Sequence, residues 1–250
     1  MSADTTADAT GSPRATGAAA VPAPAADPAP AHAIRSVEDL LAFTATGGRT
    51  KYLHFWGHRP QRDGSVGPGC LSQWWPAPFT VGGATYATAE HWMMAGKARL
   101  FSDGDAERRA LAAAHPQQAK NAGRSVRGFD DETWRRERFA LVVEGSAHKF
   151  AAHPELRDYL LGTGRRVLVE ASPLDRVWGI GLAADDDRAA DPATWRGLNL
   201  LGFALMEARS LLAAGGSAPS WRQPSQEPPQ AVRDAEAAPR GRTESAEGRT

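Results

Sequence analysis

The composition of the two ends limits the part of this chain that can form a hydrophobic core. Residues 1–33 are rich in alanine, proline, threonine and serine without apolar periodicity, and residues 215–250 are rich in proline, glycine and charge. Segments of this kind bury too little apolar surface to offset the entropy lost on ordering. We therefore expect two disordered tails around a single domain at 34–214, where roughly 180 residues are enough for a substantial core.

Charge and cysteine content exclude several classes of protein. The chain has 29 basic and 29 acidic residues, so no overall field attracts it to nucleic acid or anionic lipid. The single cysteine, Cys70, excludes an internal disulfide and a zinc site built on paired cysteines. The N-terminus lacks the pattern of a secretory signal, and no apolar run approaches the roughly 18 residues that span a bilayer. We expect a cytoplasmic protein without membrane attachment.

Helical patterns dominate the core. The segment VGGATYA predicts a hairpin turn, and the proline-interrupted LSQWWPAPF predicts an edge strand or irregular structure. The last helix is expected to present a stripe of leucines that begins at Leu198. Helices with few strands indicate an α+β class and a compact, mainly helical domain. We expect helices at 36–45, 89–101, 105–114, 116–122, 131–150, 154–162 and 195–212, and strands at 51–56 and 166–171.

The helix in YATAEHWMMAGKA carries polar residues that a buried helix does not need. With Thr88 as N-cap, Glu90, Met94 and Lys97 share one face. Glu90 and Lys97 are then roughly 10 Å apart along the axis, too far for a tight ion pair but close enough to reach into one pocket. The ordinary alternative is that Glu90 complements the helix dipole and that Lys97 lies along the surface.

The stretch VEASPLDRVWGIGL, residues 169–182, reads as a strand followed by a loop that contains Asp175, Trp178 and Gly179. Ligands favour loops at the carboxyl ends of strands. The glycines resemble a dinucleotide fingerprint, but they come too late after the strand and no helix follows, so we exclude a Rossmann site. Asp175 has an equally good structural explanation as the acceptor of an Asx turn or a helix cap.

Two further helical segments contain candidate ligand-binding residues. Lys120 and Arg124 share a helix face with Arg127 one turn on, which suits a phosphate, although a solvated surface explains the same stripe. Asn199 and Gly202 interrupt the aliphatic last helix. The Asn199 amide offers a donor and an acceptor, whereas a close helix crossing explains Gly202 equally well.

Tryptophan is abundant in the core. Of eight tryptophans, only Trp221 lies outside residues 34–214, and several of the others neighbour glycines or the polar residues above. Flat aromatic rings in such positions are suited to stacking on a planar nitrogen heterocycle.

Eight motifs occur in one order between about Tyr52 and Leu212: FWG, LSQWWPAPF, YATAEHWMMAGKA, HPQQAKNAGR, HKF, LLGTG, LVEASPLDRVWGIGL and WRGLNLLGFALM. This ordered set resembles the NADAR family, whose bacterial members include an N-glycosidase acting on riboflavin-biosynthesis intermediates. Family members commonly have Ser-Asn followed by Phe or Tyr where this chain has Ser72-Gln73-Trp74. The resemblance therefore does not define the shape of that wall of the pocket.

The resemblance implies an α+β domain that hydrolyses the N-glycosidic bond between ribose C1 and a heterocycle or its amine. One implied substrate class is the phosphoribosylamino-pyrimidines of flavin synthesis, which would give ribose 5-phosphate and a diamino-pyrimidine. The alternative is ADP-ribose attached to guanine, so that nucleic acid is a partner only as an ADP-ribosylated substrate. A noncatalytic module that binds ADP-ribose or NAD is the third hypothesis. No cofactor or metal is implied.

Breaking a ribosyl C–N bond builds positive charge on C1 and the ring oxygen, so the reaction needs a nearby carboxylate and an acid or base for the nitrogen or the water. Glu90 is the first candidate for the acid–base role. Lys97 is a candidate Schiff-base nucleophile or binding cation, and Asp175 is expected to orient the ribose hydroxyls or the water. The candidate substrate-binding residues are Trp56, Gly57, Ser72, Trp74, Lys120, Arg124, Trp178, Gly179 and Asn199.

Overall fold

Seven helices and four short strands make up the part of the chain that the computed structural model describes, residues 34–216. The α+β class is confirmed, while the predictions for 1–33 and for the tail beyond residue 216 lie outside the described residues. The helices are α1 (Val37–Ala45), α2 (Ala89–Leu100), α3 (Gly104–Leu111), α4 (Pro116–Arg124), α5 (Asp131–Ala152), α6 (Pro154–Gly162) and α7 (Leu200–Ala213). The strands are β1 (Tyr52–Phe55), β2 (Phe79–Val81), β3 (Ala84–Tyr86) and β4 (Val167–Glu170), and short 3₁₀ helices are η2 (Pro68–Leu71), η3 (Asp187–Ala190) and η4 (Pro192–Thr194).

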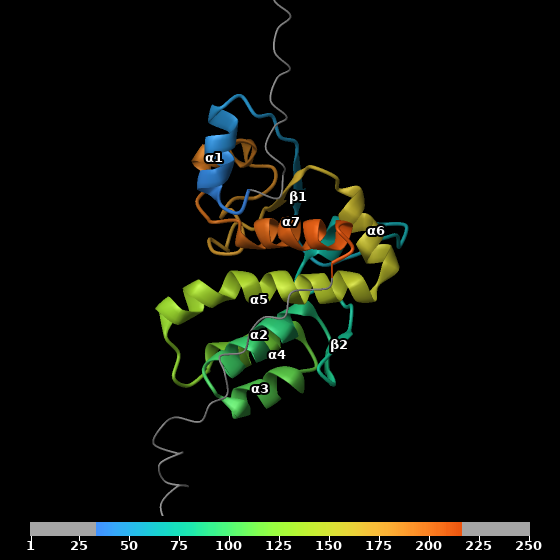
Figure 1. Cartoon of the computed structure of the whole chain (residues 1–250), viewed down its shortest axis with the longest axis vertical. Coiled ribbons are helices and arrows are strands. Elements are labelled where there is room, and N and C mark those ends of the chain that lie inside the picture. Colours follow the sequence, from blue (N-terminus) through green and yellow to red (C-terminus); the bar gives the residue numbers. More distant parts are fainter. Residues whose placement is uncertain (1–33, 217–250) are drawn as a thin grey trace, which may run out of the picture.

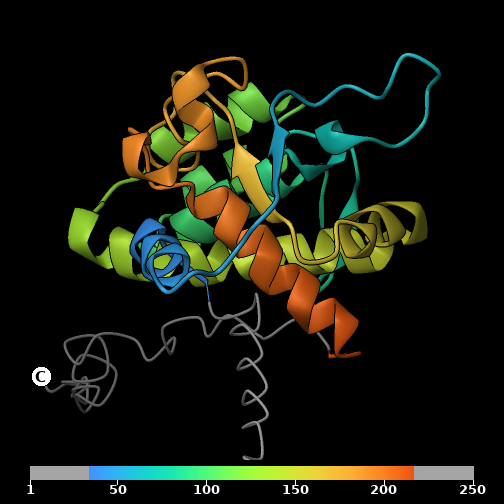
Figure 2. The same cartoon turned by 90° about the horizontal axis from the view of Figure 1, so that it is seen from above.

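The long helix α5 organises the packing. It lies between α7 on one side and α2 on the other, and α2 in turn packs against α3 and α4 (Figure 1). On the α7 side, β1 and β4 pair in parallel, with Tyr52 opposite Val167 and Phe55 opposite Glu170. β4 packs against α7 near the middle of the molecule (Figure 2). The carboxyl ends of β1 and β4 therefore meet at one edge of a two-stranded sheet.

Helices α1 to α6 each begin within one residue of the predicted start, because caps and prolines mark these positions in the sequence. Thr88 is the N-cap of α2 as predicted, but its hydroxyl bonds His91 Nδ1 at 2.8 Å rather than a backbone amide. The expected hairpin joins β2 and β3 through Gly82 and Gly83, which have positive φ angles of 59° and 81°.

The predicted start of the last helix is wrong. The sequence pattern places residues from Trp195 in this helix, but α7 begins at Leu200. The amides of Arg196 and Leu198 instead donate to the carbonyls of Ile180 and Arg176, at 2.9 and 3.0 Å. These bonds tie the segment to the loop after β4, and Leu198 remains 44% exposed instead of joining the leucine stripe.

Glycines allow α2 and α5 to cross closely. A Cβ atom on Gly145 of α5 would lie 2.2 Å from Trp92 Cδ1, and one on Gly96 of α2 would lie 2.6 Å from Leu141 Cδ1. The Trp92 indole N–H donates to the Leu141 carbonyl at 2.8 Å across the same crossing. The first turn of α2 is thereby held at a fixed height above α5.

We expect Gly145→Ala to lower the free energy of unfolding by about 1–3 kcal/mol, because the added methyl group must displace the Trp92 ring. Gly162→Ala is the matched control, since a Cβ there meets nothing within 4 Å in the described structure. Its stability should be unchanged or slightly higher. Urea unfolding of both variants checks this, and equal midpoints would contradict the close crossing.

Candidate functional site

A cavity of about 590 Å³ lies between the first turn of α2, helices α4 and α5 and the loop after β4. This volume falls in the usual range of roughly 300–1,000 Å³ for small-molecule sites. Of the residues predicted from the sequence, Ser72, Trp74, Glu90, Lys120, Arg124, Asp175 and Trp178 line it. The lining also includes residues that were not predicted, among them Gln73, Phe129, Trp134, Arg138, Glu170 and Leu174.

Glu90 is the most enclosed charged group of the lining, with only 3% of its surface exposed. Its amide donates to the Gln73 carbonyl at 2.9 Å, which joins the start of α2 to the adjacent wall. Burial raises the pKa of Glu90 to about 7, although the cations of Lys120 and Arg124 oppose this shift. Its Oε1 atom is buried and has no hydrogen-bond partner among residues 34–216. Glu90 therefore lines the cavity and keeps one carboxyl oxygen without a hydrogen-bond partner in the described chain.

A buried lysine binds the backbone of the segment that leads into residues 72–74, which form one wall of the cavity. Lys149 of α5 is fully buried, and its Nζ donates to the carbonyls of Cys70 and Ser72 at 2.6 and 2.8 Å. Burial lowers the pKa of Lys149 to about 7. In front of this wall, the Trp74 ring lies 5.7 Å from the ring of His115, between centroids, and is half-buried. The indole is thus presented at the cavity on a fixed backbone.

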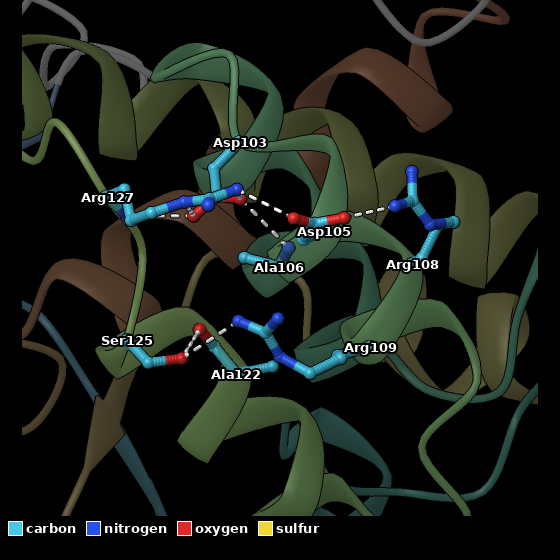
Figure 3. Close-up of polar contacts among 8 residues, drawn as sticks. All are labelled: Asp103, Asp105, Ala106, Arg108, Arg109, Ala122, Ser125 and Arg127. Atoms are coloured by element: carbon cyan, nitrogen blue, oxygen red, sulfur yellow. Dashed lines mark hydrogen bonds and ion pairs between the residues drawn. The ribbon is translucent and has the colours of Figure 1, made fainter.

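The predicted basic stripe is shorter in the structure than in the sequence. Lys120 Nζ lies 6.0 Å from the centroid of the Trp74 ring, and Arg124 lies one turn further along α4, beside the same cavity. Arg127 does not join them, because its guanidinium pairs with Asp103 and Asp105, each at 2.8 Å (Figure 3). Lys120 and Arg124 are therefore the two residues of the stripe that remain available to an anion in the cavity.

The Arg127 network has a structural role instead. Asp103 is 3% exposed and also accepts from the Arg127 amide at 2.8 Å, as Figure 3 shows for the paired side chains. These bonds hold the pKa of Asp103 well below its usual range. They fix the segment between α4 and α5, which carries the cavity residue Phe129.

Asp175 performs the structural role that its sequence context suggested and also lines the cavity. Its Oδ1 atom accepts from the amides of Val177 and Trp178, both at 2.8 Å, which is the geometry of an Asx turn. The turn places the half-buried Trp178 side chain in the lining. The two explanations of Asp175 are therefore compatible.

Lys97 and Trp56 lie outside the cavity lining of the described chain. Lys97 Nζ sits 4.1 Å from the centroid of Phe129 and 5.4 Å from that of Trp134, and burial lowers its pKa. It supports two aromatic rings of the lining rather than entering beside Glu90, so the geometry does not favour a Schiff-base role. Trp56 is 65% exposed at the end of β1, next to Gly57.

Asn199 and Gly179 are also absent from the lining within residues 34–216. Asn199 is fully buried, and both atoms of its amide bond the backbone of β4, so it does not read the edge of a ligand. Gly179 acts through its backbone, because its carbonyl accepts from the backbone N–H of Asn199 at 3.1 Å. Both residues position the neighbouring strand.

Glu170 is a lining residue that the sequence analysis missed. It is the last residue of β4, and its Oε2 atom is inaccessible and unpaired within the described chain. Burial raises the pKa of Glu170 to about 8, with further contributions from the negative charges of Asp175 and Glu90. A charged residue at the carboxyl end of a short apolar strand was the available signal, because parallel strands place ligands at that end.

Residues 34–216 contain neither a membrane-spanning helix nor a cluster of metal ligands. None of the helices is long and apolar enough to cross a membrane. No group of three or more histidine, cysteine, aspartate or glutamate side chains in this range is placed to hold a metal ion.

A family model and several known proteins are similar to this chain over most of the described residues. Residues 54–213 match the model of the NADAR domain. An N-glycosidase of Acanthamoeba polyphaga mimivirus is 38% identical over 164 residues, which are 64% of this chain and 95% of that protein. An N-glycosidase of Nostoc punctiforme is 33% identical over 59% of this chain and 90% of its own length. The NMR structure of Escherichia coli YbiA superposes with a TM-score of 0.53 at 27% identity, covering 67% of this chain and 88% of that one.

The raised carboxyl pKa values predict how stability depends on pH. Between the ordinary pKa of 4.5 and about 7 for Glu90, or about 8 for Glu170, the folded chain binds more protons than the unfolded chain. The free energy of unfolding should therefore fall as pH rises through this window. Glu90→Gln should reduce that fall by about 1–3 kcal/mol. Urea unfolding at pH 5.5 and pH 8 measures it.

The control for this prediction is Glu155→Gln, because Glu155 is exposed in the first turn of α6 and lies outside the cavity. This variant should keep the pH dependence of the unmodified chain. An equal pH dependence in Glu90→Gln would show that the Glu90 carboxyl is ionised throughout the window.

Proposed function

This chain belongs to the NADAR family and is a hydrolase of N-glycosidic bonds, and we propose that its substrate is a phosphoribosylamino-pyrimidine of early flavin synthesis. The products would be ribose 5-phosphate and the free diamino-pyrimidine. The observation that carries this proposal is the meeting of buried carboxyls, cations and flat aromatic rings in one cavity of about 590 Å³.

The carboxyls suit the reacting end of such a substrate. Cleavage of the C–N bond develops positive charge on ribose C1 and the ring oxygen, and negative groups in a poorly solvated site stabilise that charge strongly. Glu90 supplies an unpaired carboxyl oxygen with a pKa of about 7, which suits a group that exchanges protons at neutral pH. Its proposed role is to remove a proton from the attacking water.

The cations suit the phosphate. Lys120 and Arg124 project from one face of α4 into the same cavity as Glu90. Arg138 of α5 also lines it, and its buried Nε atom has no hydrogen-bond partner in the described chain. Charge-assisted hydrogen bonds from these groups would hold the 5-phosphate and fix C1 relative to the carboxyls.

The aromatic wall suits the heterocycle. Trp74 and Trp178 both line the cavity and are half-buried, so each leaves ring surface for stacking. The Gln73 Nε2 atom is buried beside them without a partner among the described residues, and an amide there can bond a polar edge of the base. In this proposal, Gln73 takes the reading role that the sequence suggested for Asn199.

ADP-ribose attached to guanine is the second candidate substrate. Leu174 and Phe129 of the lining are 93% and 44% exposed, so apolar surface is available to a larger leaving group that projects from the cavity. A ribosyl C–N bond and a phosphate are common to both candidates, and the same carboxyls would serve either reaction.

Product analysis separates the candidates. Purified chain and its Glu90→Gln variant are incubated separately with the phosphoribosylamino-pyrimidine and with ADP-ribosylated guanosine, and products are identified by mass spectrometry. We expect ribose 5-phosphate from the first substrate, and a loss of about 10²–10⁴-fold in kcat in the variant with binding retained. Release of ADP-ribose alone would favour the second candidate, and no product from either would favour a noncatalytic binding module.

Lys120→Gln tests the phosphate site. The variant should raise KM about 10- to 100-fold for the phosphorylated substrate, because one charge-assisted contact is lost. The effect should largely disappear for the same riboside without its 5-phosphate. Arg136→Gln, which removes an exposed cation outside the cavity, should leave both KM values unchanged. Equal effects of Lys120→Gln on both substrates would place the phosphate elsewhere.

A further inference from the structure

Three residues that the sequence singled out converge on the end of β4. The Asn199 Oδ1 atom accepts from the Glu170 amide, and its Nδ2 donates to the Leu168 carbonyl, both at 2.9 Å. A Cβ on Gly202 would lie 2.0 Å from the Leu168 carbonyl oxygen, and one on Gly179 would lie 2.8 Å from that of Glu170. Only glycine fits at positions 179 and 202, because the backbone at both positions comes close to carbonyl oxygens of β4.

This arrangement fixes the backbone from which the Glu170 side chain extends. The Glu170 carbonyl accepts from the Ile180 amide at 2.9 Å, so both of its backbone groups are engaged. Asn199 reaches its position in the left-handed conformation, with φ 51° and ψ 33°. A non-glycine residue there costs on the order of 1 kcal/mol or more, and such strain is concentrated at functional sites.

No side-chain hydrogen bond of Glu170 recorded within residues 34–216 explains this support. Its Oε2 atom is inaccessible to solvent and has no partner in residues 34–216, and the same is true of Glu90 Oε1. Both residues line the same cavity. An unpaired buried carboxyl oxygen is costly to a folded protein unless a ligand completes it.

We propose that Glu170 is the second catalytic carboxyl of this pocket and that it donates the proton taken up by the departing nitrogen. This assignment rests on the proposed function. Cleavage sends the electron pair of the C1–N bond to nitrogen, which takes the proton of the neutral Glu170 carboxyl. Water adds its oxygen to C1 and gives a proton to Glu90. Passage of that proton back to Glu170 restores both groups, so the net reaction is hydrolysis.

The surroundings divide the two roles. Burial raises the pKa of both carboxyls, to about 7 for Glu90 and about 8 for Glu170, while Lys120 lowers and Asp175 raises both values. The two environments differ in Arg124, which favours the ionised form of Glu90, and in the charge of Glu90, which disfavours that of Glu170. At neutral pH the proton therefore resides mainly on Glu170, the donor, and Glu90 is the readier base. The charged groups that share this cavity are Glu90 of α2, Lys120 and Arg124 of α4, Asp131 and Arg138 of α5, and Asp175 and Arg176 of the loop.

Leaving-group dependence tests the assignment. In Glu170→Gln, kcat on the phosphoribosylamino-pyrimidine should fall about 100-fold or more. The loss should be less than about tenfold on nicotinamide mononucleotide, because its pyridine leaves as a neutral molecule without taking up a proton. The fall in wild-type kcat above a pH of about 8 should be absent from the variant. Glu155→Gln is the surface control and should keep both activities and the pH profile.

Equal losses on the two substrates, or a variant that keeps the fall in kcat above pH 8, would overturn the proton-donor role. If the wild type does not cleave nicotinamide mononucleotide, the pH profile decides. If it cleaves neither the phosphoribosylamino-pyrimidine nor ADP-ribosylated guanosine, the proposed function fails independently of the role of Glu170. Carbon-13 NMR of labelled glutamate then decides for Glu170: a resonance that is protonated at pH 7 and absent from Glu170→Gln supports the assignment, and an ionised one overturns it.

Discussion

The side-chain amide of Asn199 is the interaction on which the rest of the pocket depends. Its two hydrogen bonds to β4, each 2.9 Å long, join the start of α7 to the end of the sheet. The backbone N–H of Asn199 donates to the Gly179 carbonyl and joins both to the loop after β4. The strand end that carries Glu170 and the turn that carries Trp178 are thereby fixed relative to α7. Because α7 packs on α5, and α5 on α2, this anchoring extends to Glu90.

The pocket keeps carboxyls in an environment that disfavours their charge. Removing Glu90 and Glu170 from water raises the pKa of both, and the cations of α4 offset only part of that effect. The tight crossing of α2 and α5, with Gly145 against Trp92, holds the helices in place around them. Buried carboxyls with raised pKa values lower stability at neutral pH, and close packing elsewhere compensates.

The sequence predicted most elements and part of the site. Caps and prolines marked the starts of α1 to α6, whereas the loop before α7 was read as helix because its partners, the carbonyls of the 176–180 loop, are distant contacts. Glu90 and Lys97 do share a helix face, but spacing does not reveal that Phe129 and Trp134 cover Lys97. A terminal glutamate on an apolar strand reads as a boundary, so Glu170 was missed.

By itself, the sequence determined where a core can form, that helices with few strands build it, and which chemical groups are available: carboxyls, cations and indoles in unusual local contexts. Only the tertiary structure decided which of these groups meet. Residues 72–74, Glu90, Lys120 and Glu170 come together through packing between distant segments, and local periodicity carries no record of that packing. Their pKa values also depend on burial, which exists only once the chain has folded.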